Sequence, residues 1–166
     1  MLWVIPAAIL GLAYARAGRC EEALPLLERA AELASSLGAP ILNFLAEARL
    51  LASRVDEARA AATRACELSA QRGERGWEAW SWWTLGEIDA KRADVSSAGD
   101  SYRRALTGAE TLGMRPLVAQ CHLGLGRLHR RAGRKPQAIE HLGTAKSLFG
   151  EMTMSWWQGE AEREML

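Results

Sequence analysis

The sequence has few of the residues that enzymes and metal proteins use for chemistry. It contains three cysteines and three histidines in 166 residues. Cys20, Cys66 and Cys121 stand too far apart to form a zinc or redox motif. His122 and His129 share one face of an expected helix but lack a clear third and fourth ligand. The phosphate-loop, HExxH and GxSxG patterns are also missing, so no catalytic residue, metal ligand or cofactor is predicted and enzyme activity is not expected.

Neither sign of charge dominates, and no apolar run is long enough to cross a bilayer. Lysine and arginine number 21 against 20 aspartates and glutamates, which gives a formal net charge of +1 and no overall attraction to nucleic acid or anionic membrane. The apolar start, residues 1–15, lacks the basic region of a signal peptide. Widely spaced cysteines suit a reducing compartment. We therefore predict a cytoplasmic protein with no nucleic-acid or membrane partner.

What the sequence does contain is one pattern in four copies. In each copy a leucine precedes a small residue, an alanine follows twelve residues later, and a second alanine comes seven residues after that. The copies are 35, 40 and 40 residues apart, a period typical of solenoid proteins. The four copies are Leu10, Gly11, Ala23 and Ala30; Leu45, Ala46, Ala58 and Ala65; Leu85, Gly86, Ala98 and Ala105; and Leu125, Gly126, Ala138 and Ala145.

Each copy predicts a pair of antiparallel helices that pack closely. The small residue makes a thin place on the first helix, and the two alanines lie on one face of the second helix because seven residues make two turns. Thin surfaces let helices approach at a shallow angle, while larger residues fill the space between them. An all-α solenoid of four helical hairpins is therefore expected.

These columns resemble the tetratricopeptide repeat, which places a large residue before Leu-Gly and an aromatic residue or leucine between two alanines. The second copy is the weakest, with Ala46 for glycine, Arg49 for tyrosine and Ala62 for the second large residue. The resemblance covers roughly residues 4–150. It implies a right-handed α-solenoid that acts as a non-catalytic scaffold for proteins or peptides. The third copy carries Trp82, Leu85, Gly86, Ala98, Tyr102 and Ala105.

Two stretches add a narrower resemblance. Residues 73–80 and 112–128 are similar to the C-terminal repeat tails of bacterial signalling proteins. In those proteins a class III adenylate or guanylate cyclase and a P-loop ATPase precede repeats with a period longer than the common 34 residues. This similarity implies that the chain is the interaction or sensor tail of such a protein.

Glycines and prolines between the copies predict where the helices begin and end, because glycine favours the end of a helix and proline the first turn of the next. We expect a single domain over residues 1–166, with a last helix that covers the end of the solenoid. The expected repeats are about 4–38, 39–75, 76–114 and 115–150, with a capping helix at 153–165. The expected hairpin helices are 2–17, 20–37, 40–53, 55–72, 75–92, 94–112, 115–132 and 135–150.

In tetratricopeptide repeats the first helix of each hairpin lines a concave groove through fixed positions. Two interpretations of Trp80 and Trp83 stay open, since buried tryptophans pack between helices and exposed ones lead binding sites. A pocket around them would make the chain a small-ligand sensor rather than a peptide-binding scaffold. The groove positions that the resemblance implies are Asn43, Glu47, Trp80, Trp83, Glu87, Lys91, Leu123, Arg127, Arg130 and Arg131.

Basic residues gather at the far end of this expected groove. Arg127, Arg130 and Arg131 lie close to Arg134 and Lys135 in the sequence. Such a cluster is either solvated surface or a site for a carboxylate-bearing segment. An acidic stretch of a partner protein is therefore predicted to bind toward the fourth repeat.

The first helix is apolar with no earlier repeat in this sequence to cover it. Leu2, Trp3, Ile5 and Ile9 would form an exposed apolar patch, which usually marks an interface. We predict a homodimer in which two first helices pack across a two-fold axis. The alternative is that the first residues fray and the helix begins near Pro6.

Overall fold

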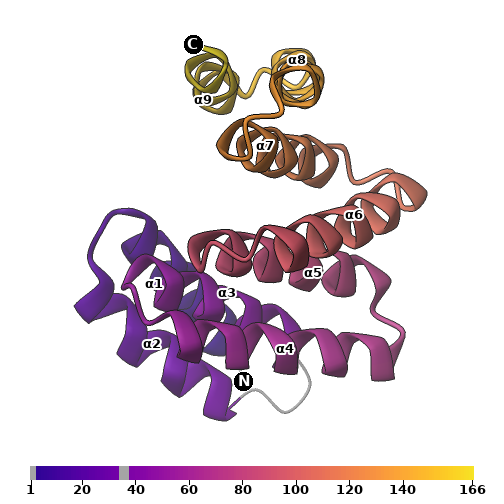
Figure 1. Ribbon diagram of the computed structural model, residues 1–166. Coiled ribbons are helices and arrows are strands. Elements are labelled where there is room, and N and C mark those ends of the chain that lie inside the picture. The colour runs from indigo at the N-terminus through magenta and orange to yellow at the C-terminus, as the bar shows by residue number, and fades with distance from the viewer. Residues whose placement is uncertain (1–2, 34–37) are drawn as a thin grey trace.

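The computed structural model describes residues 3–33 and 38–166, and these residues form nine α-helices and no strand. The helices stack from α1 and α2 at one end to α8 and α9 at the other (Figure 1). The prediction of an all-α repeat solenoid is confirmed. The helices are α1 (Val4–Arg16), α2 (Cys20–Leu33), α3 (Gly38–Leu51), α4 (Val55–Arg72), α5 (Arg75–Lys91), α6 (Val95–Thr111), α7 (Arg115–Arg131), α8 (Lys135–Glu151) and α9 (Ser155–Met165).

The odd-numbered helices form one side of the stack. Every helix packs against the next one along the chain, and α3 also packs against both α1 and α5, as α5 does against α7. Within the described residues, no two of α2, α4, α6 and α8 pack together in this way. The layer of odd-numbered helices is therefore the inner side of the solenoid, and we call it the inner face.

Glycines on the inner helices make room for large side chains from the outer helices. A Cβ atom at Gly86 would lie 2.6 Å from Cδ1 of Tyr102, and one at Gly126 would lie 2.6 Å from Cγ of Leu142. Atoms do not approach that closely, so even alanine would force these side chains to move. The paired alanines of the four copies are buried in the same helix contacts.

The leucine column is buried in three copies and exposed in one. Leu45, Leu85 and Leu125 are 4%, 6% and 2% exposed, whereas Leu10 is 45% exposed. Each buried leucine packs against the hairpin before it; Leu85, for example, shares a cluster with Ala58 of α4. No described residue takes that place beside Leu10, so the expectation of a core residue there is wrong.

The turns inside the four hairpins are built in two ways. Gly18 and Gly133 have φ angles of 78° and 72° in the first and fourth hairpins, while Ser53 and Ala93 have φ angles of 61° in the second and third. Glycine adopts this left-handed region freely, but a residue with a Cβ atom is strained there. The second and third hairpins therefore carry backbone strain that the other two avoid.

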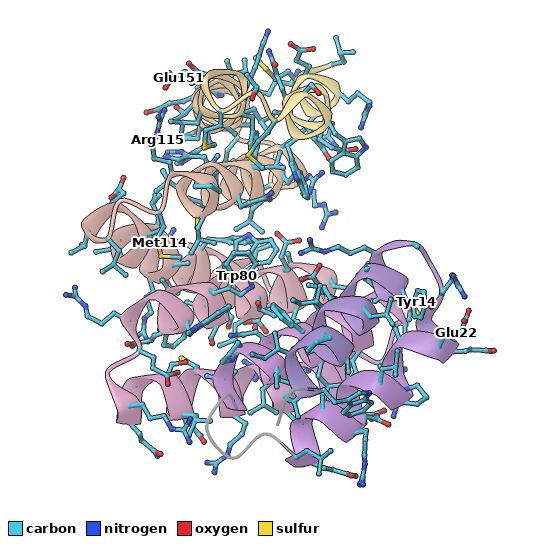
Figure 2. All side chains as sticks on the ribbon, turned by 180° about the vertical axis from the view of Figure 1, so that it is seen from behind. Tyr14, Glu22, Trp80, Met114, Arg115 and Glu151 are labelled. Carbon is cyan, nitrogen blue, oxygen red and sulfur yellow. The ribbon has the colours of Figure 1, made fainter. Side chains whose placement is uncertain are left out.

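Helix α9 covers the end of the last hairpin. It packs against α8, and Ala161 is fully buried beside Phe149. Arg115 at the start of α7 forms an ion pair with Glu151 at the end of α8 (Figure 2). The second helix was expected to reach residue 37; α2 is described as far as Leu33, and residues 34–37 lie outside the described part of the chain.

Candidate functional site

The inner face contains a cavity with tryptophan walls. Its volume is about 560 Å³. Trp80 and Trp83 of α5 line it together with Trp156 and Trp157 of α9, and Glu47 of α3 contributes a carboxylate. Trp80 lies near the middle of the stack (Figure 2). We call this the aromatic cavity.

A smaller cavity adjoins the aromatic cavity. It has a volume of about 170 Å³, shares Glu47, Trp83 and Trp157 with its neighbour, and also reaches Glu87 and Arg127. Trp83 is 9% exposed, and its indole Nε1 has no hydrogen-bond acceptor among the described residues. We call this the acidic cavity because it contains two glutamates.

A row of aromatic rings links the aromatic cavity to a third cavity. The ring centroids of Trp80 and Trp83 are 5.6 Å apart, those of Trp77 and Trp80 are 6.3 Å apart, and those of Phe44 and Trp77 are 6.1 Å apart. Phe44 and Trp77 line a wholly apolar cavity of about 240 Å³, together with Ile5 and Ile9 of α1. We call the three cavities and this row the groove.

The two glutamates of the groove differ in their partners. Glu47 accepts hydrogen bonds from Arg16 at 2.7 and 3.1 Å, so its charge is compensated. Glu87 accepts a hydrogen bond from the Tyr102 hydroxyl at 2.7 Å, and no ion pair to it is formed within residues 3–33 and 38–166. Burial raises the pKa of Glu87, while the Tyr102 hydrogen bond and the more distant Arg127 oppose that rise.

Five of the expected groove residues line these cavities and two lie in the core. Glu47, Trp80, Trp83, Glu87 and Arg127 all line the aromatic or acidic cavity.

Asn43 and Leu123 point instead between helices. The Asn43 amide is fully buried and donates to the Ser81 hydroxyl at 3.0 Å, and Leu123 is 1% exposed beside Phe149. The family positions locate a residue on the inner helix, but the local crossing of neighbouring helices decides whether its side chain reaches the groove. Lys91, at the end of α5, is exposed.

Helix α9 pairs with two arginines at the basic end of the groove. Arg127 donates to Glu164 and Glu160, both at 2.8 Å, and Arg130 forms an ion pair with Glu164 at 2.5 Å. Arg131 donates to the Ala90 carbonyl at 3.4 Å. The sequence placed these arginines opposite an acidic partner, but α9 supplies the carboxylates.

The contribution of α9 to the groove was missed by sequence reasoning, which treated this helix only as a cap. Four of its side chains line the cavities or bind the arginines. The available signal was the pair Trp156-Trp157 followed by Glu160 and Glu164, which are four residues apart and so share one helix face. Trp156 is 63% exposed, which is unusual for a residue serving only to cap a core.

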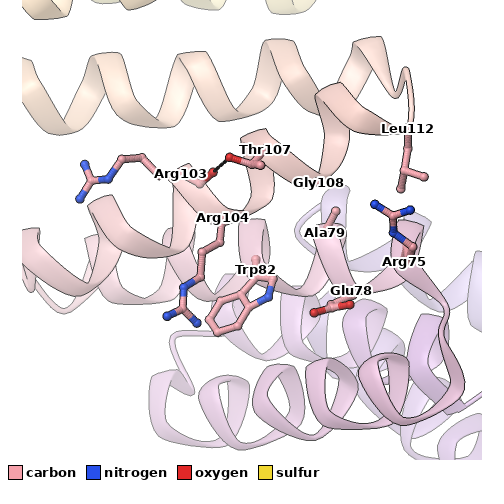
Figure 3. A pocket seen from close by; sticks show the side chains of 9 residues that line it. All are labelled: Arg75, Glu78, Ala79, Trp82, Arg103, Arg104, Thr107, Gly108 and Leu112. Carbon is pink, nitrogen blue, oxygen red and sulfur yellow. Dashed lines mark hydrogen bonds between the residues drawn. The ribbon is translucent and has the colours of Figure 1, made fainter.

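Another cavity, of about 520 Å³, lies between α5 and α6. Arg104 covers the ring of Trp82, with its guanidinium carbon 4.5 Å from the ring centroid. Figure 3 shows the guanidinium of Arg103 pointing away from Arg104, and Arg75 lying at the opposite end beside Leu112. The charged groups therefore do not converge on one ligand. Trp82, expected in the core aromatic position, is only partly buried.

The histidines gather between α7 and α8. Nδ1 of His122 lies 2.9 Å from Nδ1 of His141, and the ring of His129 stacks on His141 at 5.4 Å with an angle of 4° between the rings. Burial lowers the pKa of all three side chains. In the described part of the chain, no group of three histidine, cysteine or acidic side chains is placed to hold a metal ion.

The structure describes three of the four residues expected to drive self-association. Leu2 lies outside the described residues. Trp3, Ile5 and Ile9 are 48%, 50% and 58% exposed. Helix α1 begins at Val4, between the two starts that the sequence allowed. Self-association through this patch stays a prediction.

Of the helices in residues 3–33 and 38–166, none combines the length and apolar character needed to span a membrane.

Solved structures resemble the chain over most of its length. BtubC (BKLC) from P. vanneervenii is 22% identical, with a TM-score of 0.75 over 90% of this chain and 64% of that protein. Aspartyl phosphate phosphatase F from Bacillus subtilis is 12% identical, with a TM-score of 0.81 over 96% of this chain and 44% of that protein. The chain thus spans less than two thirds of these two proteins. A putative kinesin light chain from Podosopora anserina with TPR-like repeats is 15% identical, with a TM-score of 0.74 over 98% of this chain and 83% of that one.

These identities show the fold alone, and the family follows from the sequence match. No curated protein matches the sequence. The tetratricopeptide repeat model matches residues 10–73 and 84–146. The first stretch begins at Leu10, the leucine of the first copy, and the second ends just after Ala145, the last alanine of the fourth copy. The match covers well over half of the sequence, so the chain belongs to the tetratricopeptide repeat family.

Proposed function

We propose that the groove on the inner face binds a segment of a partner protein and that the chain is a non-catalytic interaction scaffold. Tetratricopeptide repeat proteins are generally scaffolds for protein interactions. The observation that carries the proposal is the row of rings from Phe44 to Trp83, which joins an apolar cavity to the aromatic cavity. Partly exposed tryptophans in a concave surface are the residues that most often dominate binding energy.

The spacing of the cavities suits side chains of one bound segment. Trp77 lines the apolar cavity and Trp83 the aromatic cavity, and the two residues are about 9 Å apart along α5 at 1.5 Å per residue. An extended segment covers that length in about three residues and a helix in about two turns. Two apolar anchors of one segment can therefore occupy both cavities.

A small apolar ligand is the second candidate. The aromatic cavity, at about 560 Å³, has the size of a pocket for a small molecule. It shares lining residues with the acidic cavity, and the row of rings joins it to the apolar cavity. Both features favour a longer ligand, since a small molecule would leave most of the row uncovered. We therefore rank the sensor function second.

The narrower parts of the proposal concern the partner and the setting. An acidic partner segment would have to displace Glu160 and Glu164 from Arg127, so we no longer expect acidity to govern binding. The resemblance of residues 73–80 and 112–128 to repeat tails of bacterial signalling proteins supports a role as such a tail. Cys20, Cys66 and Cys121 are free thiols, which suits the cytoplasm.

Selection from a library of random peptides displayed on phage tests the scaffold proposal. We expect selected peptides to lose at least about tenfold in affinity for the variants Trp80→Ala and Trp157→Ala, because both rings wall the aromatic cavity. Trp82→Ala is the matched control, since Trp82 lies on the same helix but lines the cavity between α5 and α6. Thermal melts would check that the variants fold. If no selected peptide depends on Trp80, the groove is not the binding site.

We also propose self-association through α1, which the exposed side chains of Trp3, Ile5 and Ile9 support. Because Ile5 and Ile9 also line the apolar cavity, a dimer would cover that end of the groove. Analytical ultracentrifugation would compare the wild type with a variant carrying Ile5→Glu and Ile9→Glu. A dimer that the two charges dissociate is the expected result. A wild type that stays monomeric at concentrations on the order of tens of micromolar would remove this proposal.

A further inference from the structure

Among the described residues that line the groove, Glu87 is the charged side chain that forms no ion pair. The Tyr102 hydroxyl donates to it at 2.7 Å, but this donor is neutral, and no ion pair to Glu87 is formed among the described residues. Arg127, which lines the same cavity, already donates to Glu160 and Glu164. Arg131 acts on Glu87 only from a distance, since its own hydrogen bond goes to the Ala90 carbonyl. Glu87 is partly buried, and a ligand that takes water from its carboxylate is costly unless it supplies a cation.

The surroundings of Glu87 suit a cation with an apolar stem. Trp83 and Trp157 line the acidic cavity from α5 and α9, and Glu47 adds a second carboxylate. The faces of tryptophan rings attract ammonium and guanidinium groups, and they also cover the methylene stems of lysine and arginine. A cavity lined by two indoles and a carboxylate therefore suits a long basic side chain.

We propose that the acidic cavity receives a lysine or arginine side chain of the bound segment, with its cationic group at Glu87 and its stem against Trp83 and Trp157. This inference rests on the proposed binding of a partner segment. It specifies the chemistry of one anchor of that segment, and it reverses the charge that the basic cluster of the sequence suggested.

The alternatives to a basic anchor are unfavourable for physical reasons. An anionic side chain would bring a further negative charge next to Glu47 and Glu87, where Arg127 is already held by two carboxylates of α9. An apolar side chain would displace water from Glu87 without compensating its charge. A cation both fills the cavity and pairs with the carboxylate, and the cation that already lines the cavity, Arg127, is paired with two carboxylates of α9.

The test uses peptides selected on the wild-type chain as above and has two arms. In the first, the basic residue that the selected peptides share is replaced with norleucine, which keeps the stem and removes the charge. Binding to the wild-type chain should weaken by about tenfold, because a charge pair and a cation–π contact are both lost. This arm needs no change in the protein, so misfolding cannot explain its result.

In the second arm, the variant Glu87→Gln should bind the basic and norleucine peptides equally, while retaining an oxygen that accepts from Tyr102. Glu21→Gln, at an exposed residue of α2, is the control and should keep the full difference between the two peptides. Two outcomes would overturn the basic anchor and leave the scaffold proposal intact. In one, the peptides that depend on Trp80 share no basic residue. In the other, the basic and norleucine peptides differ in affinity for Glu87→Gln as much as they do for the wild type. Failure to select any peptide that depends on Trp80 would overturn both.

Discussion

The second and third hairpins have the same pattern forty residues apart, yet their helices are held together differently. In the second hairpin the contact consists of small side chains, with Ala46 and Ala62 both fully buried. In the third, the equivalent residues are Gly86 and Tyr102, and the tyrosine ring lies against both Gly86 and Gly124 of the next hairpin. One hairpin thus brings two small surfaces together, and the other inserts a ring between two glycines.

The difference has a consequence for the groove. The phenol of Tyr102 passes Gly86 and reaches Glu87 on the inner face, to which it donates a hydrogen bond. The second hairpin has no such connection, and its glutamate, Glu47, is held by Arg16 of α1 instead. The core residue that fills the third hairpin therefore also determines how its groove carboxylate is held.

The strongest test of this comparison is to remove the ring. Tyr102→Ala should lower the free energy of unfolding by about 3–5 kcal/mol, the usual loss when a large buried aromatic residue is truncated. Ala62→Gly, at the equivalent position of the second hairpin, should lower it by only about 1 kcal/mol. Urea denaturation would measure both. Equal losses of unfolding free energy in the two variants would show that the large side chain of the third hairpin contributes no more to packing than the alanine of the second.

A second test converts the third hairpin to the chemistry of the second. Gly86→Ala alone should lower the free energy of unfolding by about 1–3 kcal/mol, because its Cβ atom would meet the Tyr102 ring. Gly86→Leu and Ala98→Leu should cost as much or more for the same reason.

The double variant Gly86→Ala, Tyr102→Ala reproduces the pair found at Ala46 and Ala62. Its loss should be smaller than the sum of the two single losses, because the alanine methyl enters space that the ring has left. Strict additivity in the denaturation data would contradict the close contact between Gly86 and Tyr102.

Substitutions in the turns should change the free energy of unfolding by less, and the change should be the same in the second and third hairpins. Ser53→Gly and Ala93→Gly should each raise the free energy of unfolding by about 0.5 kcal/mol, because relief of the positive φ outweighs the added entropy of glycine. Gly133→Ala in the fourth hairpin should lower it by about 1 kcal/mol. Differential scanning calorimetry would resolve these changes, and a loss of stability in Ala93→Gly would argue against strain in that turn.

The smallest expected effect is a pH dependence of stability that arises from the histidines of the fourth hairpin. Burial lowers the pKa of His122, His129 and His141; His141 lowers that of His129 further, and Glu140 opposes the shift of His122 and His141. The unfolded chain therefore binds protons at a higher pH than the folded chain. Stability should be full above about pH 6.5 and should fall as the pH drops below that value.

Replacing His122 and His141 with glutamine should flatten this dependence. Arg103 and Arg134 also face His129, so that residue is left in place to keep its surroundings unchanged. Denaturation at a series of pH values would compare the double variant with the wild type. The same slope in both would exclude the histidine cluster as its source.

Much of the fold could be predicted because it depends on short-range patterns. The leucine, glycine and alanine columns specify where two helices of one hairpin touch, and those helices are close in the sequence. The helix bounds differ from the prediction by a few residues at most ends. Trp80, Trp83 and Glu87 of α5, which the family resemblance assigned to the groove, line the cavities in the structure.

The rest depended on the path of the whole chain. Glu47 and Trp156 line one cavity although more than a hundred residues separate them, because small rotations between successive hairpins add up to bring α9 toward α3 and α5. No short-range sequence pattern predicts the combined rotation of the hairpins. The sequence by itself determined the repeated hairpin and its inner face. Only the tertiary structure decided that α9 pairs with Arg127 and Arg130, that Glu87 forms no ion pair among the described residues, and that four tryptophans from two distant helices line one cavity.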